Sequence, residues 1–128
     1  MSNLLLDTCG LIWLAQGGGQ LSKSTISAID DAQIVYVSSV SAWEISQLYA
    51  KQKLGLPCEP SKWFPDFLNS QNILELPLNS EAAIKSSSLP WHHKDPADRF
   101  IIATAIIKNL SIVSGDKKFP KYGVHVLA

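Results

Sequence analysis

Short, continuous apolar runs alternate with helical patterns along this chain, and this alternation constrains the fold more than any other feature. Five runs have the composition of buried strands: residues 4–6, 34–37, 73–76, 111–113 and 124–127. They lack the strict apolar–polar alternation of a strand that has one face in water. Strands that are covered on both faces of a parallel sheet show this pattern.

Helical spacing and helix-capping residues fill the intervals between these runs. Six segments are predicted to be helical: residues 8–15, 22–32, 41–53, 60–68, 80–87 and 96–109. Strands that alternate with helices indicate an α/β fold with a mainly parallel sheet. We find no internal repeat and no linker, so residues 1–128 are expected to form one domain.

Composition narrows the class of protein further. Hydrophobic residues make up 46% of the 128 residues and charged residues 17%, which excludes a disordered chain. The longest apolar run, at residues 100–107, is too short to cross a bilayer, and the first residues lack the basic start of a signal peptide. Two cysteines are too few for a disulfide framework. We therefore expect a cytoplasmic protein without a membrane partner.

Acidic residues follow the predicted strands. Asp7 ends the first run, Glu44 lies in the helix after the second run, and Asp116 follows the fourth run. Asp95 and Asp98 open the longest helix. Ligands of open parallel sheets bind beyond the carboxyl ends of the strands, so these acids are predicted to meet at one edge of the sheet.

Each acid also has a purely structural interpretation. Ser41 and Glu44 have the spacing of a capping box, with Ser41 as the N-cap, and Asp95 with Asp98 fits the same logic. The other two acids could cap the turns that follow them. Capping can explain each acid by itself but explains the whole set less well, because clustered carboxylates repel each other unless a cation lies among them. Together they favour Mg²⁺ or Mn²⁺, which prefer oxygen ligands.

A metal held by carboxylates suits the hydrolysis of a phosphodiester. The metal lowers the pKa of a bound water, and a second ion about 3.5–4 Å away stabilises the leaving oxygen. No side-chain nucleophile is then needed. The sequence has no G-x-S-x-G nucleophile elbow and no phosphate-binding loop of the G-x-x-x-x-G-K type.

The balanced net charge hides an uneven distribution. There are 11 basic and 11 acidic residues, but without the five clustered acids the rest of the molecule carries +5. A path for RNA could follow six lysines, although a solvated basic face explains each of them equally well. These lysines are Lys51, Lys53, Lys94, Lys117, Lys118 and Lys121.

Other residues near the acids are open to two interpretations. Arg99, the only arginine, either orients Asp95 or Glu44, which we favour, or binds phosphate. His92 and His93 are expected to be exposed loop residues rather than ligands. Cys9 is expected to be a small core residue. Three tryptophans, Trp13, Trp43 and Trp63, are expected in the core or in an interface, whereas Trp91 is a loop residue that could stack on a base.

Four motifs, in order and correctly spaced, resemble those of PIN-domain proteins, and most closely those of VapC-type toxins. They are L-L-L-D-T at residues 4–8, S-A-W-E-I at 41–45, H-K-D-P-A-D-R-F-I-I-A at 93–103 and V-S-G-D at 113–116. The resemblance implies a three-layer α/β/α fold with a central five-stranded sheet. It also implies RNA cleavage that depends on Mg²⁺ or Mn²⁺, homodimerisation, and neutralisation by a cognate antitoxin protein.

The resemblance assigns roles position by position. Asp7, Glu44 and Asp98 would be the principal metal-binding and catalytic acids, and Asp116 matches a more variable fourth position. Asp95 and Thr8 match supporting positions. The chain departs from the family at Cys9, where many relatives have histidine, and at Ala97, where an aromatic residue is common. These departures bear on substrate choice more than on activity.

Two alternatives remain open from the sequence. The first is a PIN-like scaffold that binds RNA or a protein without cutting. The second is a phosphoacceptor signalling domain, which also gathers carboxylates around Mg²⁺. That class needs paired acids after the first strand, an Asp closing the third and a Lys closing the fifth. Here Asp7 is followed by Thr8, and the third run ends at Leu76 and Pro77.

Overall fold

A five-stranded parallel sheet forms the centre of the molecule. The computed structural model describes residues 3–128. The strands are β1 (Asn3–Leu6), β2 (Ile34–Ser38), β3 (Ile73–Leu76), β4 (Ser111–Val113) and β5 (Val126–Leu127). They lie in the order β3-β2-β1-β4-β5, and each neighbouring pair is parallel. The predicted mainly parallel sheet is confirmed, with β1 at its centre.

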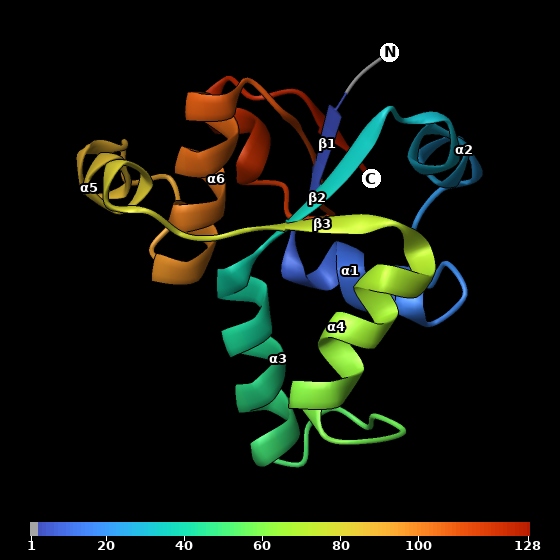
Figure 1. Ribbon diagram of the computed structural model, residues 1–128. Helices are drawn as coiled ribbons and strands as arrows, with labels where there is room; N and C mark the ends of the chain where they lie inside the picture. Colours follow the sequence, from blue (N-terminus) through green and yellow to red (C-terminus); the bar gives the residue numbers. More distant parts are fainter. Residues whose placement is uncertain (1–2) are drawn as a thin grey trace.

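Helices cover both faces of this sheet (Figure 1). They are α1 (Thr8–Ala15), α2 (Lys23–Asp31), α3 (Ser39–Ala50), α4 (Pro60–Gln71), α5 (Ser80–Ser88) and α6 (Pro96–Lys108), with a short 3-10 helix at Phe119–Tyr122. Between residues 3 and 128, no helix has both the length and the hydrophobicity needed to cross a membrane. The arrangement is the three-layer α/β/α fold that the sequence resemblance implies.

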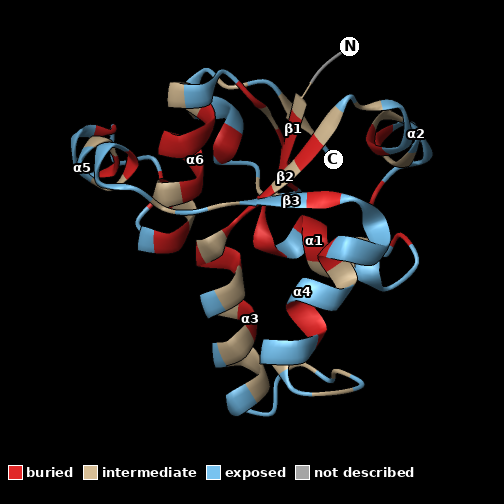
Figure 2. Ribbon diagram, in the orientation of Figure 1, coloured by how far each residue is buried: buried red, intermediate tan, exposed pale blue. Residues whose placement is uncertain are grey.

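Two separate cores hold the layers together. Leu4 and Leu6 of β1 point to one face of the sheet, where they pack with residues of α1 to α4 such as Ile45 and Phe64. Leu5 points to the other face and packs against α6 and the 3-10 helix. The three leucines are fully buried, which explains why β1 shows no polar alternation (Figure 2).

The predicted elements are all present, but the start of α3 differs from the prediction. The helix begins at Ser39 because Ser38, the last residue of β2, is its N-cap and accepts a hydrogen bond from the Val40 N–H at 3.1 Å. The predicted capping box of Ser41 and Glu44 is therefore wrong. Ser41 is fully buried inside the helix, so the Glu44 side chain is not used as a cap. The 3-10 helix has no counterpart among the predicted elements.

A glycine allows α1 to approach β4 closely. Gly10 is buried in the first turns of α1, and its N–H donates to Asp7 Oδ1 at 2.6 Å. A Cβ atom at this position would lie 2.9 Å from the Val113 carbonyl oxygen and 3.0 Å from Asp7 Oδ1. Backbone atoms of a central strand cannot move aside easily. The close approach therefore requires glycine and holds Asp7 against the end of the sheet.

Replacing Gly10 by alanine tests this constraint. Alanine normally stabilises a helix relative to glycine by about 0.5–1 kcal/mol. Here the clash with Val113 outweighs that gain, and we expect a net loss of about 1–3 kcal/mol in the free energy of unfolding, measured with urea. Gly55→Ala is the control, because a Cβ there meets nothing within 4 Å. A Gly10→Ala protein as stable as the control would show that α1 is free to shift.

Candidate active site

The central strands bring the first and last of the predicted acids together. Asp7 directly follows β1, caps α1 and is only 4% exposed. Asp116 lies three residues beyond β4, the neighbour of β1 in the sheet. Burial raises the pKa of Asp7 and the charge of Asp116 adds to this, so the two acids are close enough to interact electrostatically. The sheet therefore places both acids at one edge, as predicted.

Two helices bring the other acids to the same edge. Glu44 lies inside α3, where the Thr8 hydroxyl donates a hydrogen bond to its Oε1 atom. Thr8 also lies 2.9 Å from the Ser41 hydroxyl, so α1 and α3 are linked at the base of Glu44. Asp95 is the N-cap of α6 and accepts the backbone N–H groups of Ala97 and Asp98. The predicted capping role of Asp95 is confirmed.

The structure adds a histidine to this cluster. His93 is buried, and its Nε2 atom lies 3.0 Å from Asp98 Oδ2 and 2.8 Å from Asp116 Oδ2. Its neighbour His92 is exposed, as expected, but the prediction that His93 is an exposed loop residue is wrong. The reason is not local, because the Tyr122 hydroxyl of the 3-10 helix accepts the His93 backbone N–H at 2.8 Å. No periodic pattern in the sequence points to this contact.

The hydrogen bonds of His93 define which ring nitrogen carries the proton. The Asp95 backbone N–H donates to Nδ1 at 3.1 Å, so Nδ1 acts as the acceptor. In the neutral ring the proton therefore lies on Nε2, which donates to Asp116 Oδ2 and lies 3.0 Å from Asp98 Oδ2. His93 could bind a metal through Nε2 only in the other tautomer, whose Nδ1–H would face the Asp95 N–H. Its geometry is that of a residue that orients the acids.

Arg99 organises the loop that carries His93. Its buried guanidinium donates to four backbone carbonyl groups, and Trp91 covers it with its ring centroid 3.7 Å away. The four carbonyls belong to Ser86, Leu89, Pro90 and His93. The expected contact with Asp95 or Glu44 is therefore not made. A guanidinium engaged in this way has no free face for a phosphate.

The acids form a centre of uncompensated negative charge. Burial and then the charges of the neighbouring acids raise the pKa of Asp98 to about 8. Burial is also the main cause of the raised pKa of Asp7 and of Glu44. Burial acts in the same direction on Asp116, but hydrogen bonds from the Lys118 backbone N–H and from His93 hold its pKa below the usual value. No lysine or arginine among residues 3–128 forms an ion pair with these acids.

This donor set fits a hard divalent cation. Four carboxylates supply only oxygen atoms, which Mg²⁺ and Mn²⁺ prefer. One oxygen each from Asp98 and Asp116 and one nitrogen of His93 already lie within 4.8 Å of one another. A cation here would relieve the repulsion that raises the pKa of Asp98. Asp7, Glu44, Asp98 and Asp116 are therefore the residues that could hold the metal.

The remaining candidates lie around this centre. Lys51 and Lys53 line a groove beside the acids, and Lys94 and Lys117 are exposed next to His93 and Asp116 in the sequence. Cys9 is exposed rather than in the core. Partial burial of the thiol and the surrounding carboxylates raise its pKa to about 11, which makes it a poor nucleophile at neutral pH.

Comparison with known proteins agrees with this geometry. Residues 4–124 match the family model of the PIN domain. The chain belongs to the PIN domain family.

Individual relatives of this PIN domain are distant but cover nearly its whole length. It is 26% identical over 119 residues to "Ribonuclease VapC22" of Mycobacterium tuberculosis (strain ATCC 25618 / H37Rv), a match that covers 92% of this chain and 90% of the relative. Among solved structures, DNA-bound VapBC from Salmonella typhimurium has a TM-score of 0.71 at 19% identity and covers 98% of this chain and 97% of that one. A toxin-antitoxin complex from Klebsiella pneumoniae has a TM-score of 0.67 at 17% identity, with coverage of 98% and 96%.

The raised pKa of Asp98 predicts how stability depends on pH. The pKa of Asp98 is about 8 in the folded PIN domain and near 3.8 in the unfolded chain, so Asp98 takes up a proton on folding. Its contribution to the free energy of unfolding is therefore fully present below pH 4 and is lost as the pH rises to 8. In EDTA at pH 8, Asp98→Asn should therefore be more stable than the wild type by about 1 kcal/mol or more. The difference should vanish near pH 4 in urea unfolding. Asp30→Asn, at an exposed acid of α2, is the control, and a destabilised Asp98→Asn protein at pH 8 would contradict the assignment.

A pair of substitutions tests the role of His93. Glutamine can keep a donor near the position of Nε2, whereas asparagine can keep an acceptor near the position of Nδ1. If His93 orients Asp98 and Asp116, His93→Asn should weaken Mn²⁺ binding about 10- to 100-fold in calorimetry, and His93→Gln much less. A smaller loss in His93→Asn than in His93→Gln would show instead that the contact with the Asp95 N–H is the one that matters.

Proposed function

We propose that this PIN domain is a metal-dependent endoribonuclease that acts as the toxin of a toxin–antitoxin pair. The observation that carries the proposal is the meeting of Asp7, Glu44, Asp98 and Asp116 at one edge of the sheet, where no lysine or arginine in the described part of the chain pairs with them. A cluster of this kind needs a cation, and in a PIN domain it lies where ligands of parallel sheets bind. The relative VapC22 is named as a ribonuclease, which supports the same activity.

The acids would hold Mg²⁺ or Mn²⁺, and the residues around them have distinct roles. When bound, the metal supplies a water of lowered pKa and stabilises the charge that develops on the leaving oxygen. Thr8 holds the carboxylate of Glu44 toward the centre. Asp95 fixes the first turn of α6 and thereby the position of Asp98. His93 donates to Asp116, contacts Asp98 at 3.0 Å, and so restrains both carboxylates.

The substrate class follows from charge and from the surface around the acids. Outside the five clustered acids the molecule carries +5, which suits a polyanion. Lys51 and Lys53 lie on one side of the centre, and Lys94 and Lys117 flank it in sequence. We assign these four lysines to RNA binding.

The structural neighbours suggest the biological context. The Klebsiella pneumoniae structure is a toxin-antitoxin complex, and the Salmonella typhimurium structure is DNA-bound VapBC. By analogy, we propose that a cognate antitoxin protein inhibits this chain, that the chain forms a homodimer, and that it acts in the cytoplasm on cellular RNA.

An RNA-cleavage assay tests the proposed function. Purified protein is incubated with total cellular RNA in Mg²⁺ or Mn²⁺, with and without EDTA. We expect discrete fragments that require the metal. Asp98→Asn should reduce their rate of formation at least about 100-fold, because it removes a ligand and a negative charge from the centre.

Asp30→Asn is the matched control, since it removes the same charge from an exposed position outside the site. The RNA fragments should be unchanged by this substitution. RNA binding without metal-dependent fragments, in a folded protein, would instead identify a scaffold that does not cut.

A further inference from the structure

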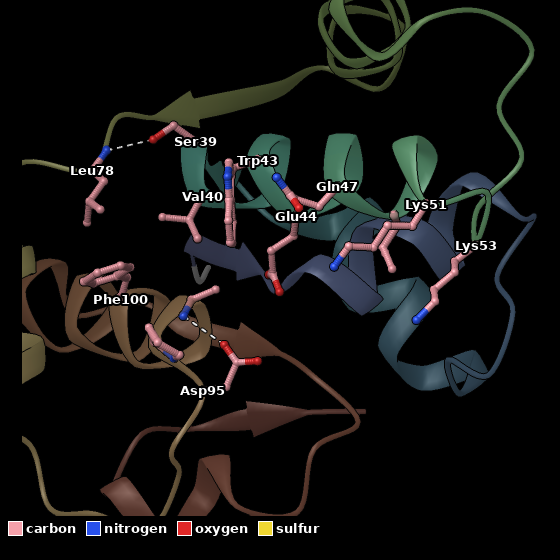
Figure 3. Close-up of a pocket in the computed structure, with 13 residues that line it drawn as sticks. Ser39, Val40, Trp43, Glu44, Gln47, Lys51, Lys53, Leu78, Asp95 and Phe100 are labelled. Atoms are coloured by element: carbon pink, nitrogen blue, oxygen red, sulfur yellow. Dashed lines mark hydrogen bonds between the residues drawn. The ribbon is translucent and has the colours of Figure 1, made fainter.

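A groove beside the acid cluster has no role in the chemistry described so far. It encloses about 660 Å³, within the range of about 300–1,000 Å³ for ligand pockets. Glu44 and Asp95 line the groove where it meets the acids, and Lys51 and Lys53 line it along α3, away from them (Figure 3). Trp43 forms part of one wall of the groove. The groove therefore connects the acid cluster with a basic surface.

The side chain of Trp43 is more exposed than is usual for tryptophan. Its side chain is 58% exposed although it lies in the second turn of α3, directly before Glu44. Phe100 of α6 lies across the groove from Trp43 (Figure 3), and Pro96 also lines the groove, so the wall on the α6 side is apolar. A flat ring exposed beside such a wall is suited to accept another flat, apolar surface.

The end of the groove is held in place by a backbone contact. The Leu78 N–H donates to the Ser39 hydroxyl at 2.9 Å, which fixes the segment after β3 to the start of α3 (Figure 3). Asp95 accepts the Ala97 N–H at 2.9 Å on the opposite side. Both walls are therefore built on anchored backbone, and the space between them is part of the fold.

Residues along α3 form a stripe that leads away from the acids. Trp43, Gln47 and Lys51 are spaced by four residues, so they lie on one face of the helix, and all three line the groove. Eight residues of helix span about 12 Å. An extended ligand that stacks on Trp43 would therefore reach Lys51 with its next charged group.

The distribution of charge favours single-stranded RNA over an apolar peptide. The basic part of the groove is formed by Lys51 and Lys53, and the lining acids, Glu44 and Asp95, both lie at the acid cluster. An apolar segment of a protein would bury these lysines without a partner. Aromatic rings that alternate with basic side chains are instead typical of surfaces that bind single-stranded nucleic acid.

We propose that this groove is a nucleobase subsite, in which Trp43 stacks on a base of single-stranded RNA next to the scissile phosphate. Lys51 and Lys53 bind phosphates further along the same strand. The subsite rests on the proposed ribonuclease function, because it places the substrate relative to the acids. Stacking accepts any base, so the groove selects unpaired RNA over duplex.

Binding of a fluorescein-labelled single-stranded RNA of mixed sequence tests the subsite. The Asp98→Asn protein serves as the background, since it does not cut the probe. Trp43→Ala, introduced into this background, should weaken binding of the probe about 5- to 150-fold in fluorescence anisotropy, and Trp43→Phe should weaken it less. Ile84→Ala is the control, because Ile84 is 73% exposed but does not line the groove.

The salt dependence of binding tests the lysines separately. Lys51→Gln with Lys53→Gln should reduce the slope of log affinity against log salt by about 0.7 for each phosphate that the protein no longer neutralises. Lys85→Gln with Lys108→Gln, outside the groove, should leave the slope unchanged. An unchanged slope in the Lys51 and Lys53 variant would remove these residues from the RNA path.

Two further measurements distinguish failure of the subsite from failure of the nuclease. Calorimetry with Mn²⁺ on the otherwise wild-type chain should show that Trp43→Ala leaves metal binding unchanged, which verifies the acid cluster. If the wild-type protein cleaves RNA, but Trp43→Ala in the Asp98→Asn protein binds the probe as tightly as Asp98→Asn alone, the subsite is refuted and the proposed nuclease function is not. A change from dimer to monomer in Trp43→Ala by sedimentation, with unchanged RNA affinity, would assign the groove to a second copy of the chain.

Discussion

Mutual repulsion among buried carboxylates is the constraint on which the site depends. Only a rigid frame can hold Asp7, Glu44, Asp98 and Asp116 together while burial and charge raise the pKa of Asp98 to about 8. The parallel sheet supplies that frame, because both of its faces are packed and the ends of β1 and β4 are side by side. The stability of the two cores thus keeps the acids close.

Neutral donors, and not lysine or arginine side chains, hold the individual acids in position. Asp7 accepts the Gly10 N–H, Glu44 accepts the Thr8 hydroxyl, and Asp116 accepts the Lys118 N–H. Each bond fixes a direction without cancelling a full charge. An arginine in the same place would have stabilised the folded chain and would also have competed with a cation. The chain instead places Arg99 behind the site, where it fixes the loop of His93.

The sequence is sufficient to predict what depends on local pattern and on topology. The strands, the helices and the meeting of the acids follow from apolar runs and from the rule that parallel strands end at one edge. The predictions fail where long-range contacts decide. His93 is buried because Tyr122 contacts it from 29 residues away, whereas the start of α3 differs for a local reason, since Ser38 at the end of β2 caps the helix. The role of Arg99 is missed because its four carbonyl partners cannot be inferred from spacing.

The departures from the family pattern that the sequence resemblance implies affect substrate choice more than they affect the acids. Ala97, where the sequence resemblance implies that an aromatic residue is common, lines the groove beside Asp95. A small side chain at this position leaves space opposite the ring of Trp43, since a larger one would extend from α6 into the groove. The positions of the acids are fixed by the sheet edge, which tolerates little change. The groove wall of α3 and α6 can vary without moving the acids, and substrate preference can therefore change while the metal-binding geometry is kept.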